Sequence, residues 1–257
     1  MFKDIVRQIL VVLATLATLA INGLANALPF NGLTTADVSA SFNVYFVPAG
    51  YVFAIWGLIY LLLIGYMVFQ ALPAQREHPV LRKIGWWYVV ASAANCAWLF
   101  TWHYEQFALT LLFMGLLLAS LIVIYLQLGI ARKPASTGEK LFIRLPFSIY
   151  LGWITVATIA NVSDVLDYFK WGGFGIDPQI WAVIMLAVAL VVAALMTLIR
   201  RDAAYLTVLV WAFVGIALNF PATPIVNISA WVAAGIAAIF FVLSLLWRPR
   251  QMPAVAS

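Results

Sequence analysis

The chain has 257 residues, of which 66% are hydrophobic and 9% are charged, and its mean hydropathy is +1.05. Soluble globular domains carry about 25% charged residues, so this composition excludes a water-soluble globule and indicates an integral membrane protein. The net charge of +5 does not indicate a nucleic-acid partner, because most basic residues lie in short connections beside long apolar runs, as in many membrane proteins.

Long apolar runs follow one another along the whole chain. They are too long and too unbroken for the alternating strands of an outer-membrane barrel, so the membrane-spanning segments must be helices. Each predicted helix can cross most or all of ~30 Å of hydrocarbon. The eight predicted spans are 5–27, 50–72, 84–103, 107–130, 145–165, 180–199, 205–220 and 227–247. We therefore expect an all-α, polytopic integral membrane helix bundle.

The first span also resembles a signal peptide. Lys3 and Arg7 precede or begin the apolar run, and Ala25-Asn26-Ala27 resembles the site that a signal peptidase cuts. The run is long enough to cross the bilayer, so we expect it to be retained. If it is cleaved, seven spans remain.

The connections between the spans alternate in charge. Every Lys and Arg except Lys170 falls at the termini or in a connection on one side of the predicted bundle. The positive-inside rule therefore places both termini in the cytoplasm. The expected location of the protein is a bacterial cytoplasmic (inner) membrane. The connection that follows the fifth span is acidic and glycine-rich, with Asp164, Asp167 and Asp177. The short turn 104–106 predicts that the third and fourth spans are antiparallel neighbours.

Residues typical of catalysis are scarce. The middle of each span lacks Asp, Glu, Lys and Arg, so neither a retinal Schiff-base lysine nor a metal site is expected. No phosphate-binding glycine loop occurs. His78 and His103 lie at span ends, where we expect solvated interfacial side chains. We therefore expect no catalytic residue and no enzyme.

Amide side chains occur within several spans, at Asn95, Asn161 and Asn219. An amide facing lipid would lose hydrogen bonds at a cost of a few kcal/mol, so these side chains should face the bundle interior. Hydrogen bonding between helices and orientation of a ligand are both open roles for them.

The distance from Trp153 to Asn161 recurs between Trp211 and Asn219. Duplication of a helical unit and coincidence are both open explanations of this spacing.

Three motifs in three spans resemble the TspO/translocator-protein family, the tryptophan-rich sensory proteins. They are Pro48-x-Gly50-x-Val52-Phe53 with Trp56-x-x-x-Tyr60, then Asn95-x-x-Trp98, then Tyr150-Leu151-x-Trp153 with Ala157-Thr158 and Asn161. The resemblance covers residues 1–167, which would form the five-helix unit of that family. Residues 168–257 would add three further spans to it.

The first motif departs from the family pattern. The family has two consecutive prolines where this chain has Pro48-Ala49, a Trp where it has Phe46, and one more residue between Phe53 and Trp56. In a regular α-helix the missing residue rotates Trp56 by about 100° relative to Phe53. Trp56 stays among the expected ligand-binding residues, and another ring of this span facing the pocket is left open.

The resemblance implies a bundle whose pocket is closed by the loop between the first two helices and holds tetrapyrroles or sterol-like molecules. Independently, flat aromatic walls with a few amides suit a planar apolar ligand. The expected ligand-binding residues are Trp56, Tyr60, Asn95, Trp98, Tyr150, Trp153, Ala157 and Asn161.

We thus expect a membrane-embedded binding or sensory protein with a regulatory or trafficking role. A secondary transporter for a small solute is the alternative, and the resemblance also allows breakdown of a tetrapyrrole, which the scarcity of acid and base groups disfavours. The expected partners are the lipid bilayer and a hydrophobic small molecule of the porphyrin or haem type, without a covalent cofactor; a homodimer is left open.

Overall fold

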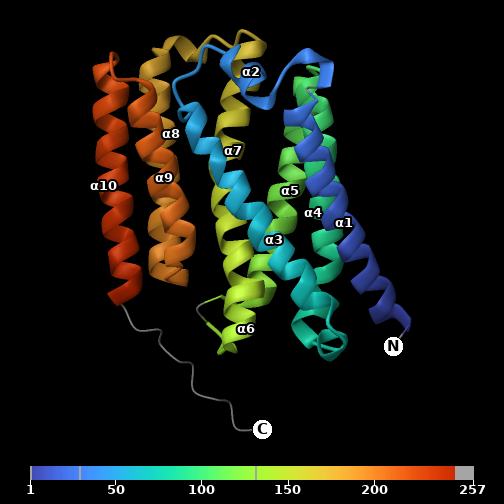
Figure 1. The fold of residues 1–257 in the computed structure, drawn as a ribbon. Coiled ribbons are helices and arrows are strands. Elements are labelled where there is room, and N and C mark those ends of the chain that lie inside the picture. Colours follow the sequence, from blue (N-terminus) through green and yellow to red (C-terminus); the bar gives the residue numbers. More distant parts are fainter. Residues whose placement is uncertain (1, 29, 131, 247–257) are drawn as a thin grey trace.

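The computed structural model describes residues 2–28, 30–130 and 132–246, and these residues form helices and connections without any β-strand. Figure 1 shows the long helices side by side in one bundle. Within the described residues they are α1 (Phe2–Ala27), α3 (Ile55–Ala71), α4 (Pro79–His103), α5 (Phe107–Leu128), α7 (Leu145–Tyr168), α8 (Pro178–Leu195), α9 (Ala203–Asn219) and α10 (Pro224–Leu246). The predicted all-α polytopic membrane fold is confirmed.

Shorter elements connect or extend the long helices. They are the α-helices α2 (Thr35–Ala40) and α6 (Thr137–Glu139), the 3-10 helices η1 (Phe30–Gly32), η2 (Gly50–Ala54), η3 (Pro73–Gln75) and η5 (Gly173–Gly175), and the π-helical turns η4 (Lys140–Arg144) and η6 (Met196–Arg200).

Six segments of the described chain are long and apolar enough to cross a membrane. They are Phe2–Ala27, Gly50–Ala71, Phe107–Leu128, Thr137–Tyr168, Pro178–Arg200 and Pro224–Leu246, and α9 is a shorter apolar helix. The chain is an integral membrane protein, while the count of eight spans and the cytoplasmic position of both termini stay predictions. Trp247, Arg248 and Arg250, which end the last predicted span, lie outside the described residues.

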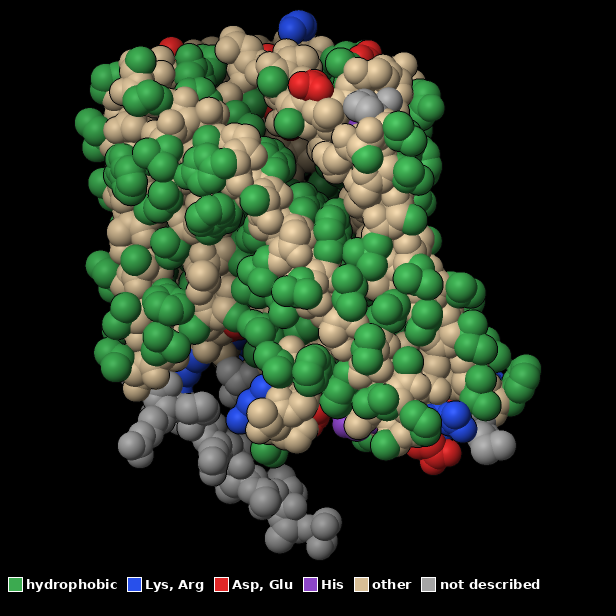
Figure 2. Space-filling model, viewed as in Figure 1, with side chains coloured by type: hydrophobic (Ala, Val, Ile, Leu, Met, Phe, Trp, Pro, Cys, Tyr) green, Lys and Arg blue, Asp and Glu red, His purple; other side chains and the backbone are tan. Residues whose placement is uncertain are grey.

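Successive long helices run in opposite directions, so α1 begins and α10 ends at the same end of the bundle (Figure 1). Most Lys and Arg side chains visible in Figure 2 gather at this end, which we call the basic end. The opposite end carries α2 and is called the α2 end. As predicted from their short connection, α4 and α5 are antiparallel neighbours.

The long helices pack as two groups. One group comprises α1, α3, α4, α5 and α7, and the other comprises α8, α9 and α10. The groups meet mainly where α9 packs against α7 and against η2. This contact places α9 directly beside the segment that carries the first sequence motif.

The five-helix group has an aromatic and polar interior. Tyr66, Tyr88 and Phe147 form edge-to-face pairs with ring centroids 5.0–5.8 Å apart. The Tyr88 hydroxyl also lies 2.8 Å from Thr15 Oγ1, which links α4 to α1. At the basic end Arg82 donates two hydrogen bonds to the carboxylate of Asp4, at 2.7 and 2.9 Å. These contacts hold α1 against α4 in the half of each helix that is nearer the basic end.

Candidate functional site

An inner cavity of about 60 Å³ lies between α3, α4, α5 and α7, beneath α2. Six of the eight residues predicted to bind a ligand line it, namely Trp56, Asn95, Trp98, Trp153, Ala157 and Asn161. Tyr60 and Tyr150 do not line the cavity but pack behind Trp56. Tyr60 stacks on the Trp56 ring at a centroid distance of 5.5 Å, and Tyr150 meets it edge-on at 6.0 Å.

Aromatic rings form much of the cavity wall. Trp153 meets Phe53 edge-to-face with centroids 5.7 Å apart, and it meets Trp56 in the same way at 6.3 Å. Trp98 and Trp102 stack nearly parallel at 5.3 Å. These rings build a rigid apolar wall that suits a flat ligand.

Phe53 and Trp56 both line the cavity, so the missing residue between them does not turn Trp56 away from it. The reason is that Phe53 lies in the 3-10 helix η2 rather than in an α-helix. A 3-10 helix has about 3 residues per turn, so side chains three residues apart lie on nearly the same side. The tighter winding therefore compensates for the missing residue in the motif.

Two of the three predicted interior amides hydrogen-bond between helices at the cavity. Asn95 Oδ1 accepts a bond of 2.8 Å from Asn22 Nδ2. Asn161 Nδ2 donates to Thr110 Oγ1 at 2.9 Å, and Asn161 Oδ1 accepts from Trp98 Nε1 at 3.3 Å. The prediction for Asn219 is wrong, because its side chain is exposed at the end of α9.

The main cavity residue that the sequence analysis missed is Asp164, which was assigned to the acidic connection after the fifth span. The structure places it inside α7, only 3% exposed and lining the inner cavity. Asp164 Oδ1 has no hydrogen-bond partner, and neither has the buried Trp153 Nε1. Trp153, Ala157, Ala160 and Asp164 follow one another at spacings of four, three and four, and this helical stripe is the signal that could have identified Asp164.

The helix α2 covers the cavity and contributes Thr35 and Ser39 to its lining. Thr34 begins α2 with a capping box, in which its side chain and that of Asp37 each accept a backbone hydrogen bond from the other residue. Trp102 Nε1 donates to Thr35 O at 3.3 Å, which fixes α2 on α4. The loop between the first two long helices therefore closes the cavity.

His103 contributes to the same contact and is not the solvated side chain that its position at a span end predicts. It is fully buried. Its Nδ1 lies 2.9 Å from Leu99 O, its Nε2 lies 3.4 Å from Thr35 Oγ1, and its ring meets Phe30 edge-on. The prediction fails because residues 30–40 fold back over the end of α4.

A family model described as TSPO-like protein matches residues 8–243 of the chain. The chain belongs to this family. The match confirms the resemblance to the TspO family, and it extends through α8 and α9 into α10. Searches of curated proteins and of solved structures gave no significant match. Membership of the TSPO-like family suggests a membrane ligand-binding or sensory role.

In this TSPO-like protein, α9 holds one edge of the inner cavity through three hydrogen bonds to backbone groups of residues 47–52. Trp211 Nε1 donates to Val52 O at 3.0 Å, Ala49 N donates to Gly215 O at 3.1 Å, and Asn219 Nδ2 donates to Val47 O at 3.1 Å. The three α9 residues are spaced by four, so they lie along one face of the helix. We call these contacts the α9 clamp and residues 47–52 the clamped segment. Trp211 and Asn219 therefore differ in role from Trp153 and Asn161, which line the inner cavity.

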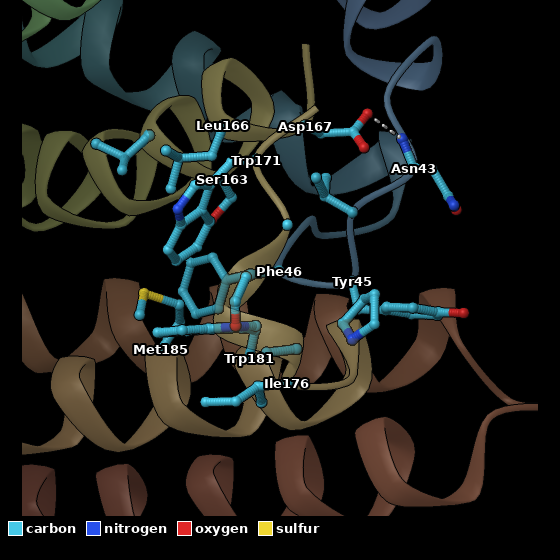
Figure 3. Close-up of a pocket in the computed structure, with 16 residues that line it drawn as sticks. Asn43, Tyr45, Phe46, Ser163, Leu166, Asp167, Trp171, Ile176, Trp181 and Met185 are labelled. Atoms are coloured by element: carbon cyan, nitrogen blue, oxygen red, sulfur yellow. Dashed lines mark hydrogen bonds between the residues drawn. The ribbon is translucent and has the colours of Figure 1, made fainter. Parts of the chain in front are cut away.

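A larger outer cavity of about 370 Å³ lies at the α2 end, between α7, the start of α8 and residues 43–46 (Figure 3). Asn43 N donates to Asp167 Oδ2 at 3.1 Å beside it, and Trp181 Nε1 donates to Gly173 O at 2.9 Å. Phe46 lines the outer cavity, whereas the next two residues, Val47 and Pro48, line the inner one. Residues 43–48 thus separate the two cavities.

Within the described part of the chain, no group of three or more His, Cys, Asp or Glu side chains lies close enough together to hold a metal ion.

Proposed function

We propose that this protein is a membrane-embedded binding and sensory protein for a planar hydrophobic ligand, of the tetrapyrrole or sterol-like class, and that the inner cavity is its binding site. The observation that carries the proposal is the aromatic wall of the inner cavity. Its rings are those of Phe53 and Trp56 in the consecutive helices η2 and α3, Trp98 in α4 and Trp153 in α7. Ring stacking would supply affinity, and a few polar groups would orient the ligand.

The size of the cavity adds a requirement to the proposal. Ligand sites for drug-sized molecules typically have about 300–1,000 Å³, whereas the inner cavity has about 60 Å³. A planar ligand of several rings therefore has to displace part of the wall. We assign the displacement to the clamped segment, because Val47 and Pro48 line the cavity and precede η2, and a shift there would break the three hydrogen bonds of the α9 clamp.

This displacement would also provide the regulatory role. A ligand shifts the balance between two conformations only if it binds one of them more tightly. A ligand that fits only the widened cavity would favour the conformation in which the clamped segment has shifted relative to α9. The three C-terminal helices would then receive the signal from the five-helix unit.

We also propose the orientation in the membrane. The concentration of Lys and Arg at the basic end favours a cytoplasmic position for that end and for both termini, in a bacterial inner membrane. The cavities at the α2 end would then receive ligand from the extracytoplasmic side or from the outer leaflet.

The test is a titration of purified protein in nanodiscs with protoporphyrin, followed by the change in porphyrin absorbance. Trp153→Phe replaces the indole of the wall with a smaller ring, and we expect it to weaken binding about tenfold, since a loss of about 1.4 kcal/mol in ring contact and buried apolar area corresponds to a factor of ten. Trp231→Phe makes the same chemical change on α10, where the side chain is 46% exposed, and should leave binding unchanged. Equal affinity in the wild type, in both variants and in an unrelated helical bundle would contradict the proposal.

A further inference from the structure

The buried carboxyl group of Asp164 lacks a partner. Its side chain is 3% exposed, and Oδ1 forms no hydrogen bond. In the parts of the chain that the structure describes, the ion pairs of Asp4 and Glu77 are with Arg82, and no basic side chain pairs with Asp164. Burying an unpaired polar group is costly, and ionisable residues inside membrane helices usually mark a ligand or ion site. The lining of the inner cavity therefore contains an acidic group with an unsatisfied oxygen.

Asp164 and Trp153 lie toward opposite ends of the inner cavity. Asp164 follows Trp153 by eleven residues on the same face of α7, which places it about 16 Å further along the helix axis toward the α2 end. The hydroxyl residues Thr35 and Ser39 of α2 line the cavity as well. The cavity thus has a polar, acidic end beneath α2 and a deeper aromatic end around Trp153.

We infer that the ligand of the inner cavity carries a positively charged nitrogen with an N–H group, which binds Asp164, while its flat apolar part lies among Trp56, Trp98 and Trp153. This inference rests on the proposed function and adds the charge of the ligand to it. A charged N–H donor gives the carboxylate a short, strong hydrogen bond that a neutral or anionic ligand does not provide.

The alternative is that Asp164 does not bind the ligand and is a neutral acid bonded to water in the small cavity. In that case, the cavity would have no preference for a cation over a neutral molecule of the same shape. A set of flat probes that differ only in charge separates the two alternatives. Aminoacridine is a planar three-ring cation with N–H donors at neutral pH, methylanthracene has nearly the same outline without charge, and anthracene carboxylate is the anionic member.

The experiment measures the affinity of each probe by fluorescence for the full-length protein in nanodiscs of zwitterionic lipid, with binding to empty nanodiscs subtracted. We expect aminoacridine to bind the wild-type protein about tenfold more tightly than methylanthracene, or better, because charge-assisted hydrogen bonds give differences of this order. Anthracene carboxylate should bind most weakly.

Asp164→Asn keeps the shape of the side chain and removes its charge, and it should reduce the ratio of the cation and neutral affinities to about one. The matched control is Asp167→Asn, which removes an identical charge three residues later on α7. Asp167 lines the outer cavity rather than the inner one. The control should keep a cation preference at least as large as that of the wild type, because it leaves the Asp164 carboxyl group in place and removes a neighbouring negative charge.

The outcomes of this experiment separately test the charge of the ligand, the role of Asp164 and the proposed function. Equal affinity for the cation and the neutral probe in the wild-type protein would overturn the inference even if Asp164→Asn failed to fold, and it would leave the proposed function standing. A cation preference that survives in Asp164→Asn would overturn the role of Asp164. Failure of all three probes and of protoporphyrin to bind above the empty nanodiscs would overturn the proposed function, and the inference with it.

Discussion

Gly215 is the position at which the α9 clamp can be tested most sharply. A Cβ atom added there would overlap Val52 Cγ2 and would lie 3.1 Å from Pro48 Cβ, and both neighbours belong to the clamped segment. Gly215→Ala should therefore push this segment away from α9 and break the hydrogen bond from Ala49 N to Gly215 O. Overpacking of this kind costs about 1–3 kcal/mol.

The intrinsic preference of a helix for alanine opposes this cost, because Gly→Ala in a helix interior gains about 1 kcal/mol. Gly235→Ala, on the adjacent helix α10, is the matched control, since a Cβ there would meet no atom within 4 Å. Gly235→Ala should gain only the stability that comes from the helix preference of alanine. The two variants should thus differ by about 1–3 kcal/mol, with Gly215→Ala the less stable.

The measurement is thermal unfolding of both variants in the same detergent, where each kcal/mol corresponds to about 2–4 °C for a chain of this size. Ligand affinity should change only in Gly215→Ala, because Pro48 and Phe53 line the inner cavity. Identical melting temperatures for the two variants would refute the clamp and the coupling that we derive from it.

Two further predictions concern single hydrogen-bonding groups. Trp211→Phe removes the N–H group that binds Val52 O and should lower stability by about 1 kcal/mol, and a loss no larger than that of Trp231→Phe under the same conditions would count against it. Asp202 accepts hydrogen bonds from Tyr125 and Ser148, yet burial raises the pKa of its carboxyl above the ordinary value. Because the folded pKa is the higher one, Asp202 stabilises the folded protein at low pH and this contribution is lost as pH rises through the folded pKa. Melting temperatures across that range should fall more steeply for the wild type than for Asp202→Asn, and parallel curves would disprove the assignment.

The helices themselves could be predicted from the sequence because their limits depend on local chemistry. Apolar runs bounded by charged residues and prolines place α5, α8 and α10 within a few residues of their observed bounds. The short connection 104–106 likewise determines that α4 and α5 are antiparallel neighbours. Such features depend on residues that are close together in the chain, so they can be predicted from one sequence.

Asp164 shows why part of the cavity could not be predicted in the same way. A carboxyl group near the end of an apolar run is typical of a connection, but α7 continues to Tyr168 and keeps Asp164 on the face of Trp153. Its burial depends on α2 and on the neighbouring helices, which cover that end of α7. His103 was mistaken for a solvated residue for the same reason.

The role of α9 was hidden for a different reason. The hydrogen bonds from Trp211 and Asn219 join residues 159 and 172 positions apart, and the local sequence contains no sign of either contact. The 3-10 helix η2 also lies at this contact with α9. The contact between α9 and η2 therefore joins distant segments at the place where Phe53 enters the cavity wall, and the local sequence does not show this contact.

The central claim, that the inner cavity binds a flat hydrophobic ligand, is tested most directly by photo-crosslinking. A planar aromatic probe that carries a photoreactive group is bound to the wild-type protein in nanodiscs, irradiated and located by peptide mass spectrometry. We expect labels on cavity residues of α3, α4 and α7, such as Trp56, Trp98 and Trp153, and loss of these labels when excess protoporphyrin is present. Labels confined to outward-facing residues such as Leu61 and Trp231 would contradict it.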